Sequence, residues 1–236
     1  MKNTLLTLVA LLASTLMYAE VPQKEKQALI DFYIATDGEN WVNTWELNEP
    51  VENWQGVTVE NNTVTGISLL FNKIKGTLPA SIGDLENLKV LELSFNEISG
   101  SLPESIGKLT KLELLAFNGN FLTGIIPSSI GNLVNLKQLH LSSNQLTGTL
   151  PYSLNNLKNI IVFNVFDNKL YGSLPEDLAT TQSLREVMIA ENNFDNTNIF
   201  SIVMLSNSGV ALDLEKPAIQ KVGNSVIAIE TPDDEN

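Results

Sequence analysis

The sequence contains no cysteine and only one histidine among its 236 residues. The absence of cysteine excludes disulfide bonds, thiolate nucleophiles and zinc–sulfur sites. A single histidine excludes a metal site with two imidazole ligands and leaves His140 as the one possible imidazole base. Basic residues are also scarce, with 14 Lys and Arg against 27 Asp and Glu and a net charge of −13. A field of this sign disfavours nucleic acid and anionic membrane surfaces as partners.

Long hydrophobic runs are missing except at the N-terminus. Residues 1–19 start with the charged Lys2, continue through an apolar segment and end on the small Ala19. This arrangement is typical of a secretory signal peptide, and the apolar segment is shorter than the roughly 20 residues that span a bilayer. We therefore expect cleavage after Ala19 and an exported protein, either secreted, on the cell surface or periplasmic, that does not insert into the membrane.

The central part of the chain repeats with a period of 24 residues. Three residue types keep the same phase, namely Asn72, Asn96, Asn120, Asn144, Asn168 and Asn192, then Gly76, Gly100, Gly124, Gly148 and Gly172, and finally Pro79, Pro103, Pro127, Pro151 and Pro175. A period of this length predicts a solenoid, in which each repeat covers the apolar face of its neighbour.

One period, residues 88–112, shows the expected structure of each coil. Leu91 and Leu93 alternate with Glu92, which is the pattern of a strand with one face inward. Asn96 follows, and an inward amide at this position can bond to backbone groups of its own coil and of the next one. We interpret the six repeated asparagines as a structural ladder.

The second half of the period returns the chain to the next strand. Gly100 permits a turn that a Cβ atom would obstruct. Pro103 then prevents a paired N–H at this corner. Ile106, Leu109 and Leu112 have helical spacing over a segment so short that it predicts a single 3₁₀ or α turn.

The full pattern resembles the leucine-rich repeats of the plant receptor-like class and reads L-x-x-L-x-L-x-x-N-x-L-x-G-x-L-P-x-x-I-G-x-L-x-x-L. Five periods over residues 64–184 carry it, and a sixth begins at Leu184. The resemblance implies an α/β fold, a right-handed horseshoe with a parallel sheet on its concave face and short 3₁₀ or α turns on its convex side. It also implies an additional short strand near each Gly-x-Leu-Pro. Plant relatives act as receptor ectodomains or as inhibitors of secreted wall-degrading enzymes.

The two ends of the chain do not follow the repeat. Residues 20–63 resemble the N-terminal cap of these proteins, with Ala28, Leu29, Phe32 and Ala35 on one helical face, followed by Trp41, Trp45 and Trp54. We assign the tryptophans to the core of the cap, with a carbohydrate-stacking platform as the alternative. Val59 replaces a cysteine of the plant caps, which fits a bacterial exported member.

Beyond the repeats of 64–194 we expect a C-terminal cap over 195–216 and a partly disordered acidic tail over 217–236.

Motifs for catalysis are absent. His140 lies between two leucines and points out of the core, and no nucleophile elbow or phosphate-binding loop accompanies it. The Asp-Gly-Glu-Asn segment at 37–40 lacks the alternating acids of a calcium loop and predicts a turn. We expect no enzymatic activity, no cofactor and no metal.

The residues that flank the inward leucines point to the predicted concave face, because side chains alternate along a strand. We predict that this face contacts a protein or peptide, or less favourably a polysaccharide, through Leu70, Phe71, Val90, Glu92, Phe95, Leu114, His140, Asn164 and Phe166. Exposed apolar groups of this kind mark interaction sites. The alternative is that these side chains pack against each other and bind nothing.

Two other functions remain open from the sequence. Hydroxyl residues flank the corner glycines and resemble the ice-binding rows of some plant leucine-rich repeat proteins. They are Ser99, Thr123 and Thr147 on one side and Thr77, Ser101, Thr149 and Ser173 on the other, interrupted by Lys75, Ile125 and Tyr171. The second alternative is an inhibitor of a secreted hydrolase.

Overall fold

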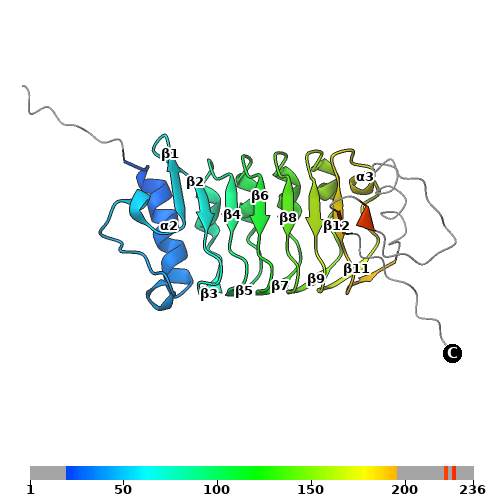
Figure 1. Ribbon diagram of the computed structural model, residues 1–236, viewed down its shortest axis with the longest axis horizontal. Coiled ribbons are helices and arrows are strands. Elements are labelled where there is room, and N and C mark those ends of the chain that lie inside the picture. The colour runs from blue at the N-terminus through cyan, green and yellow to red at the C-terminus, as the bar shows by residue number, and fades with distance from the viewer. Residues whose placement is uncertain (1–19, 196–220, 223–224, 227–236) are drawn as a thin grey trace, which may run out of the picture.

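A computed structural model describes residues 20–195, 221–222 and 225–226, and residues 20–195 form an elongated stack of coils under a non-repeating N-terminal segment (Figure 1). The expected signal peptide, nearly all of the expected C-terminal cap and most of the expected tail lie outside these residues. Within the tail segment, β14 (Lys221–Val222) and β15 (Ser225–Val226) form an antiparallel pair.

The N-terminal end of the stack is covered by a non-repeating segment. It contains α2 (Gln23–Ala35), η1 (Gly38–Asn40), η2 (Val51–Asn53) and β1 (Val57–Glu60). The helix begins directly after Pro22, which has no backbone N–H that would be left unpaired at the helix start. It stops before Asp37, whose φ of 59° lies in the left-handed region. Helix α2 lies against the first coil, as Figure 1 shows at the blue end of the chain.

The three tryptophans form the core of this segment. The ring centroids of Trp45 and Trp54 are 4.9 Å apart, and Trp41 lies 5.0 Å from Trp45 and 5.4 Å from Phe32. None of the three indoles is more than 5% exposed, and each indole N–H donates to a backbone carbonyl. The alternative of a carbohydrate-stacking platform is therefore wrong, because no ring face is available to a sugar.

The repeats build a seven-stranded sheet in which strands 24 residues apart are neighbours. After β1, which is antiparallel to its partner, the order is β2 (Thr63–Ser68), β4 (Val90–Glu92), β6 (Leu114–Ala116), β8 (Gln138–His140), β10 (Val162–Asn164) and β12 (Glu186–Met188). From β2 onward all pairs are parallel, and Val90 is in register with Leu114. This confirms the α/β solenoid and its parallel sheet.

A second parallel sheet follows the first around each coil. Its strands are β3 (Lys75–Thr77), β5 (Glu97–Gly100), β7 (Phe121–Gly124), β9 (Gln145–Gly148), β11 (Lys169–Gly172) and β13 (Asn193–Phe194). These are the additional strands that the resemblance implied. Most end at the corner glycine, before the Leu-Pro pair, because the backbone turns there with positive φ, as at Gly100 (75°).

Short helical turns complete each coil and start directly after the repeated prolines. They are η3 (Ala80–Asp84), η4 (Glu104–Lys108), η5 (Ser128–Asn132), η6 (Tyr152–Asn156) and the α-helical turn α3 (Glu176–Ala179). Their apolar residues join the inward strand residues in one continuous core, in which Leu91, Ile106 and Leu115 are fully buried. The coils therefore stack strand on strand and turn on turn.

The repeated asparagines bond successive coils together. The Nδ2 of Asn144 donates to the carbonyl oxygens of Leu141 in its own coil (3.1 Å) and of Phe117 in the preceding coil (2.9 Å). Its Oδ1 accepts the N–H of Leu122 at 2.9 Å. Asn96, Asn120 and Asn168 make the same contacts one period apart, and Asn72 and Asn192 occupy the two ends of the row.

Candidate functional site: the exposed face of the seven-stranded sheet

The outward-facing positions of β2 to β12, and of the residues that follow these strands, form four columns, which together we call the sheet face. Within each strand the central residue is buried and its two flanking residues point outward, as Val90 and Glu92 do around Leu91. The columns are Gly66, Val90, Leu114, Gln138, Val162 and Glu186; Ser68, Glu92, Ala116, His140, Asn164 and Met188; Leu70, Ser94, Asn118, Ser142, Phe166 and Ala190; and Phe71, Phe95, Gly119, Ser143, Asp167 and Glu191.

The nine predicted contact residues all lie on the sheet face, but their exposure differs. Phe71 is 67% exposed, Phe95 48% and Leu70 38%. Five others are half-buried: Val90, Glu92, Leu114, His140 and Phe166. Asn164 departs from the prediction, because its side chain is buried and its Oδ1 accepts the N–H of Phe166. The accessible apolar surface therefore concentrates at the N-terminal coils.

The column that starts at Phe71 has an unusual backbone conformation that was not predicted from the sequence. All six residues have φ between 51° and 62°, and only Gly119 is a glycine. A side chain in this left-handed region costs about 1–2 kcal/mol. The signal available in the sequence was one glycine in a column of six, which is too weak to predict the conformation.

Phe71 and Phe95 form a stacked pair in this column. Their ring centroids are 4.7 Å apart and their planes differ by 4°. A Cβ atom on Gly119 would lie 2.8 Å from the ring of Phe95, so this ring covers the glycine backbone. Aromatic contacts of this kind contribute about 0.5–1.5 kcal/mol, which offsets part of the backbone cost. The pair stands out from the surface in a fixed orientation.

Hydrogen bonds between coils also order the polar side chains of the sheet face. The Oδ1 of Asn118 accepts both the N–H and the hydroxyl of Ser142, at 3.0 and 2.9 Å. The hydroxyl of Ser94 accepts the N–H of Asn118 at 3.2 Å. The hydroxyl of Ser68 donates to the carboxylate of Glu92 at 2.7 Å. Side chains held in this way lose little entropy on binding, which favours recognition.

The surroundings of His140 favour its uncharged form. Burial lowers its pKa below the ordinary histidine value, and the negative charges of Glu186 and Glu92 oppose this effect without cancelling it. Its Nε2 lies 3.1 Å from the Oε1 of Gln138. In the part of the chain that the structure describes, no group of three or more His, Asp or Glu side chains is placed to hold a metal ion.

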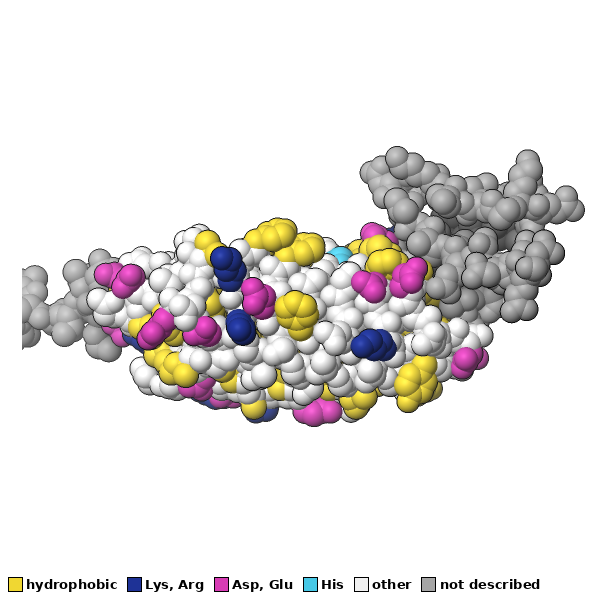
Figure 2. Space-filling view, turned by 90° about the horizontal axis from the view of Figure 1, so that it is seen from below, with side chains coloured by type: hydrophobic (Ala, Val, Ile, Leu, Met, Phe, Trp, Pro, Cys, Tyr) yellow, Lys and Arg dark blue, Asp and Glu magenta, His cyan; other side chains and the backbone are white. Residues whose placement is uncertain are grey.

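The second sheet presents a different surface, seen in Figure 2. Thr77, Ser101, Thr123, Thr149 and Ser173 are exposed there, while Ser99 and Thr147 are half-buried. Ile125 and Tyr171 interrupt these rows and are 58% and 53% exposed. Figure 2 shows apolar side chains and charges of both signs scattered among the polar ones, so this surface is not uniform.

None of the helices in the described ranges is long and apolar enough to cross a membrane.

The parallel sheets, the asparagine ladder and the 24-residue coils define a leucine-rich repeat solenoid. A family model described as a leucine-rich repeat region matches residues 69–202, which is more than half of the chain. The protein therefore belongs to the leucine-rich repeat family.

Known proteins place this chain with the plant-type members of the family. Over 92 residues it is 39% identical to the LRR receptor-like serine/threonine-protein kinase FEI 2 of Arabidopsis thaliana, a match that covers 36% of this chain and 15% of the relative. The leucine-rich repeat ectodomain of the receptor kinase SOBIR1 from Arabidopsis thaliana superposes with a TM-score of 0.66 and 27% identity, covering 75% of this chain and 97% of that one.

A second solved ectodomain is that of the receptor kinase GASSHO1/SCHENGEN3 from Arabidopsis thaliana, in complex with CASPARIAN STRIP INTEGRITY FACTOR 2. It matches with a TM-score of 0.67 and 29% identity over 72% of this chain and 21% of that one. A plant ice-binding protein matches with a TM-score of 0.54 and 22% identity over 74% of this chain and 73% of that one, a similarity of fold alone.

Proposed function

We propose that this protein is an exported, non-enzymatic binding module that recognises another protein or a peptide through the sheet face. The observation that carries the proposal is the stacked pair of Phe71 and Phe95, which remains 67% and 48% exposed although the two rings contact each other. Exposed aromatic side chains in a fixed orientation are typical anchors of protein interfaces.

Two further observations support recognition of a polypeptide. The ectodomain of GASSHO1/SCHENGEN3, which shares this fold, was solved in complex with CASPARIAN STRIP INTEGRITY FACTOR 2. In this chain the polar side chains on the coils of the aromatic pair are ordered by a hydrogen bond between coils, that of Ser68 to Glu92. A surface fixed in this way suits a defined partner.

The alternative in which the apolar residues only pack against each other accounts for less of the structure. Mutual packing explains Val90 and Leu114, which are half-buried. It does not cover the rings of Phe71 and Phe95. A role in catalysis has no support on this face either. His140 is the single imidazole of the face, and its ring nitrogen contacts the side-chain amide of Gln138.

The proposal is tested by capturing partners from the surface and medium of the producing cell with the purified protein and identifying them by mass spectrometry. We expect Phe95→Ala and Phe166→Ala to abolish capture while circular dichroism stays unchanged. Tyr152→Ala is the matched control, because Tyr152 is exposed on η6, away from both sheets. Capture by both phenylalanine variants at the level of the control would exclude the sheet face. Recovery of a hydrolase would assign the protein as an inhibitor.

Ice binding through the second sheet is not favoured by the structure. The hydroxyl rows that this function needs are interrupted by Ile125 and Tyr171, which are both exposed. The similarity to a plant ice-binding protein extends to the fold alone. Inhibition of ice recrystallisation by micromolar protein would reverse this conclusion.

A further inference from the structure

The sheet face changes character along the stack of coils. Its exposed and half-buried apolar side chains lie mostly on the N-terminal coils and include Leu70, Phe71, Val90, Phe95 and Leu114. Three carboxylates, those of Asp167, Glu186 and Glu191, lie on the coils of β10 and β12. The most exposed apolar side chains therefore lie at the N-terminal end of the face, and most of its carboxylates lie at the C-terminal end, beside the half-buried Phe166 and Met188.

No basic residue belongs to the sheet face. The four columns contain the carboxylates of Glu92, Asp167, Glu186 and Glu191 but neither lysine nor arginine, and burial favours the uncharged form of His140. Four lysines, Lys24, Lys89, Lys108 and Lys137, form ion pairs with acids outside these columns. The face thus presents net negative charge to a partner.

The nearest arginine does not neutralise the acidic end. Arg185 directly precedes Glu186 in the chain, but its guanidinium donates to the backbone carbonyl oxygens of Gln182 and Leu184. Asp167 is exposed and Glu186 is half-buried, so both are accessible to an incoming cation. Desolvated pairs between such carboxylates and a partner's cation add specificity to an interface.

The separation of the two ends matches a short extended peptide. Asp167 lies in the same column as the aromatic pair, three coils after Phe95 and four coils after Phe71. With neighbouring strands about 4.8 Å apart, these separations are about 14 and 19 Å. An extended chain rises about 3.3 Å per residue, so it covers them in about four to six residues.

We propose that the sheet face binds an extended segment of its partner that carries an aromatic or large aliphatic side chain and, about four to six residues away, a lysine or arginine. The apolar side chain contacts Phe71 and Phe95, and the cation pairs with Asp167, while Glu186 adds to the negative charge of the face. This inference rests on the proposed function and specifies the chemistry of the partner.

The probe is a set of fluorescein-labelled nine-residue peptides in a Ser/Gly background. Each has one Phe and one Lys, separated by two to seven residues in either order, and a matched peptide carries Glu in place of Lys. Fluorescence anisotropy with the purified protein at low salt gives the affinities. We expect tightest binding at separations of four to six, weaker binding of every Glu peptide, and loss of the difference at high salt because screening removes it.

Charge reversal of the protein tests the assignment of residues. In Asp167→Lys/Glu186→Lys, binding of the best Lys peptide should fall by about twofold to thirtyfold, since each exposed pair contributes modestly, and the Glu peptide should bind more tightly than before. Asp167→Asn/Glu186→Gln removes the charges with little change of shape and should abolish the preference even if the reversal perturbs folding. The control is Glu104→Lys/Glu176→Lys, the same charge change on exposed residues of η4 and α3.

Three results would overturn the inference: equal binding of Lys and Glu peptides, an equal effect of the control variant, and no binding by any Lys peptide at millimolar concentration. The proposed function fails separately, when Phe95→Ala and Phe166→Ala still capture the partner protein. If those variants lose the partner and charge reversal changes nothing, the sheet face is a binding surface with an uncharged ligand.

Discussion

At the scale of single residues, the amides of the ladder do most to keep the coils in register. The side chain of Asn144 satisfies carbonyl groups of its own coil and of the preceding one, and it accepts the N–H of Leu122, in a region where water is excluded. A buried backbone group without a partner costs about 1–3 kcal/mol. No apolar side chain of similar size replaces these bonds.

We therefore expect Asn144→Ala to lower the free energy of unfolding by about 2–4 kcal/mol, because it leaves several buried backbone groups unpaired. Asn132→Ala is the control, because Asn132 is exposed on η5 and should change stability by less than about 0.5 kcal/mol. Urea denaturation followed by circular dichroism measures both. Equal losses in the two variants would mean that the ladder does not stabilise the stack.

At the scale of elements, the short turns pack through their smallest residues. A Cβ atom on Gly107 would lie 2.5 Å from the carbonyl oxygen of Ser129 in the next coil, and Gly83 and Gly131 face Ser105 and Ser153 in the same way. In the part of the chain that is described, the buried hydroxyls of Ser105 and Ser129 have no hydrogen-bond partner. Close contact between turns therefore requires the glycine, whereas the hydroxyls of Ser105 and Ser129 add no bond to it; that of Ser153 differs, because it donates to the carbonyl oxygen of Ser128.

Two substitutions in η4 should consequently have opposite effects. Gly107→Ala forces the backbone of the next coil to move and should destabilise the protein by about 1–3 kcal/mol. Ser105→Ala removes an unpaired polar group and should be neutral or stabilising by up to about 1 kcal/mol. Thermal melting compares the two variants with the unchanged protein. A destabilising Ser105→Ala would show that the hydroxyl has a partner in solution.

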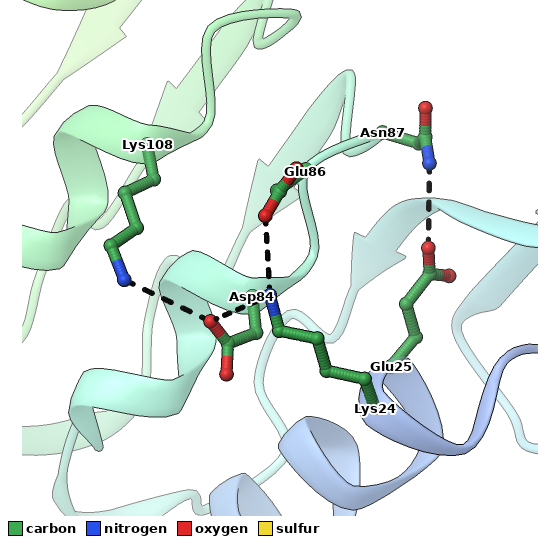
Figure 3. Close-up of polar contacts among 6 residues, drawn as sticks. All are labelled: Lys24, Glu25, Asp84, Glu86, Asn87 and Lys108. Atoms are coloured by element: carbon green, nitrogen blue, oxygen red, sulfur yellow. Dashed lines mark hydrogen bonds and ion pairs between the residues drawn. The ribbon is translucent and has the colours of Figure 1, made fainter.

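At the scale of the whole molecule, the stability of the stack depends on how its first coil is covered. The Oε2 of Glu25, a buried carboxylate on α2, accepts the N–H of Val64 at 2.7 Å, and its Oε1 lies 3.4 Å from the Nδ2 of Asn87 (Figure 3). Nearby, the exposed Lys24 forms ion pairs of 3.3 Å with Asp84 and 3.2 Å with Glu86. Each coil of a solenoid contacts only its neighbours, so loss of the cap exposes the next apolar face.

We expect the buried contact to matter more than the exposed ones. Glu25→Ala leaves the N–H of Val64 buried and unpaired and should cost about 1–3 kcal/mol. Lys24→Ala removes exposed ion pairs and should cost less than about 1 kcal/mol. Hydrogen exchange of the amides of β2 and β4 reports whether the weakening spreads along the stack. A larger loss in Lys24→Ala would contradict this order.

Much of the fold was predictable because the period repeats the same chemistry. Leucines at fixed spacing face inward, proline and glycine mark the corners, and asparagines 24 residues apart meet in the stack. The candidate site was less predictable. Phe71 and Phe95 were expected to be exposed, but their stacking and their left-handed backbone depend on the neighbouring coil. Asn164 was expected to be accessible and is buried by its own bond to the backbone.

The sequence by itself determined the solenoid, its register and the family, because these follow from a period that every coil repeats. The tertiary structure decided what lies outside the period. It joined Glu25 to Val64 across 39 residues, placed Asp167 and Glu186 on the same face as Phe95, and turned Arg185 towards the backbone. These contacts depend on side chains that differ from coil to coil, so only their positions in space reveal which of them meet.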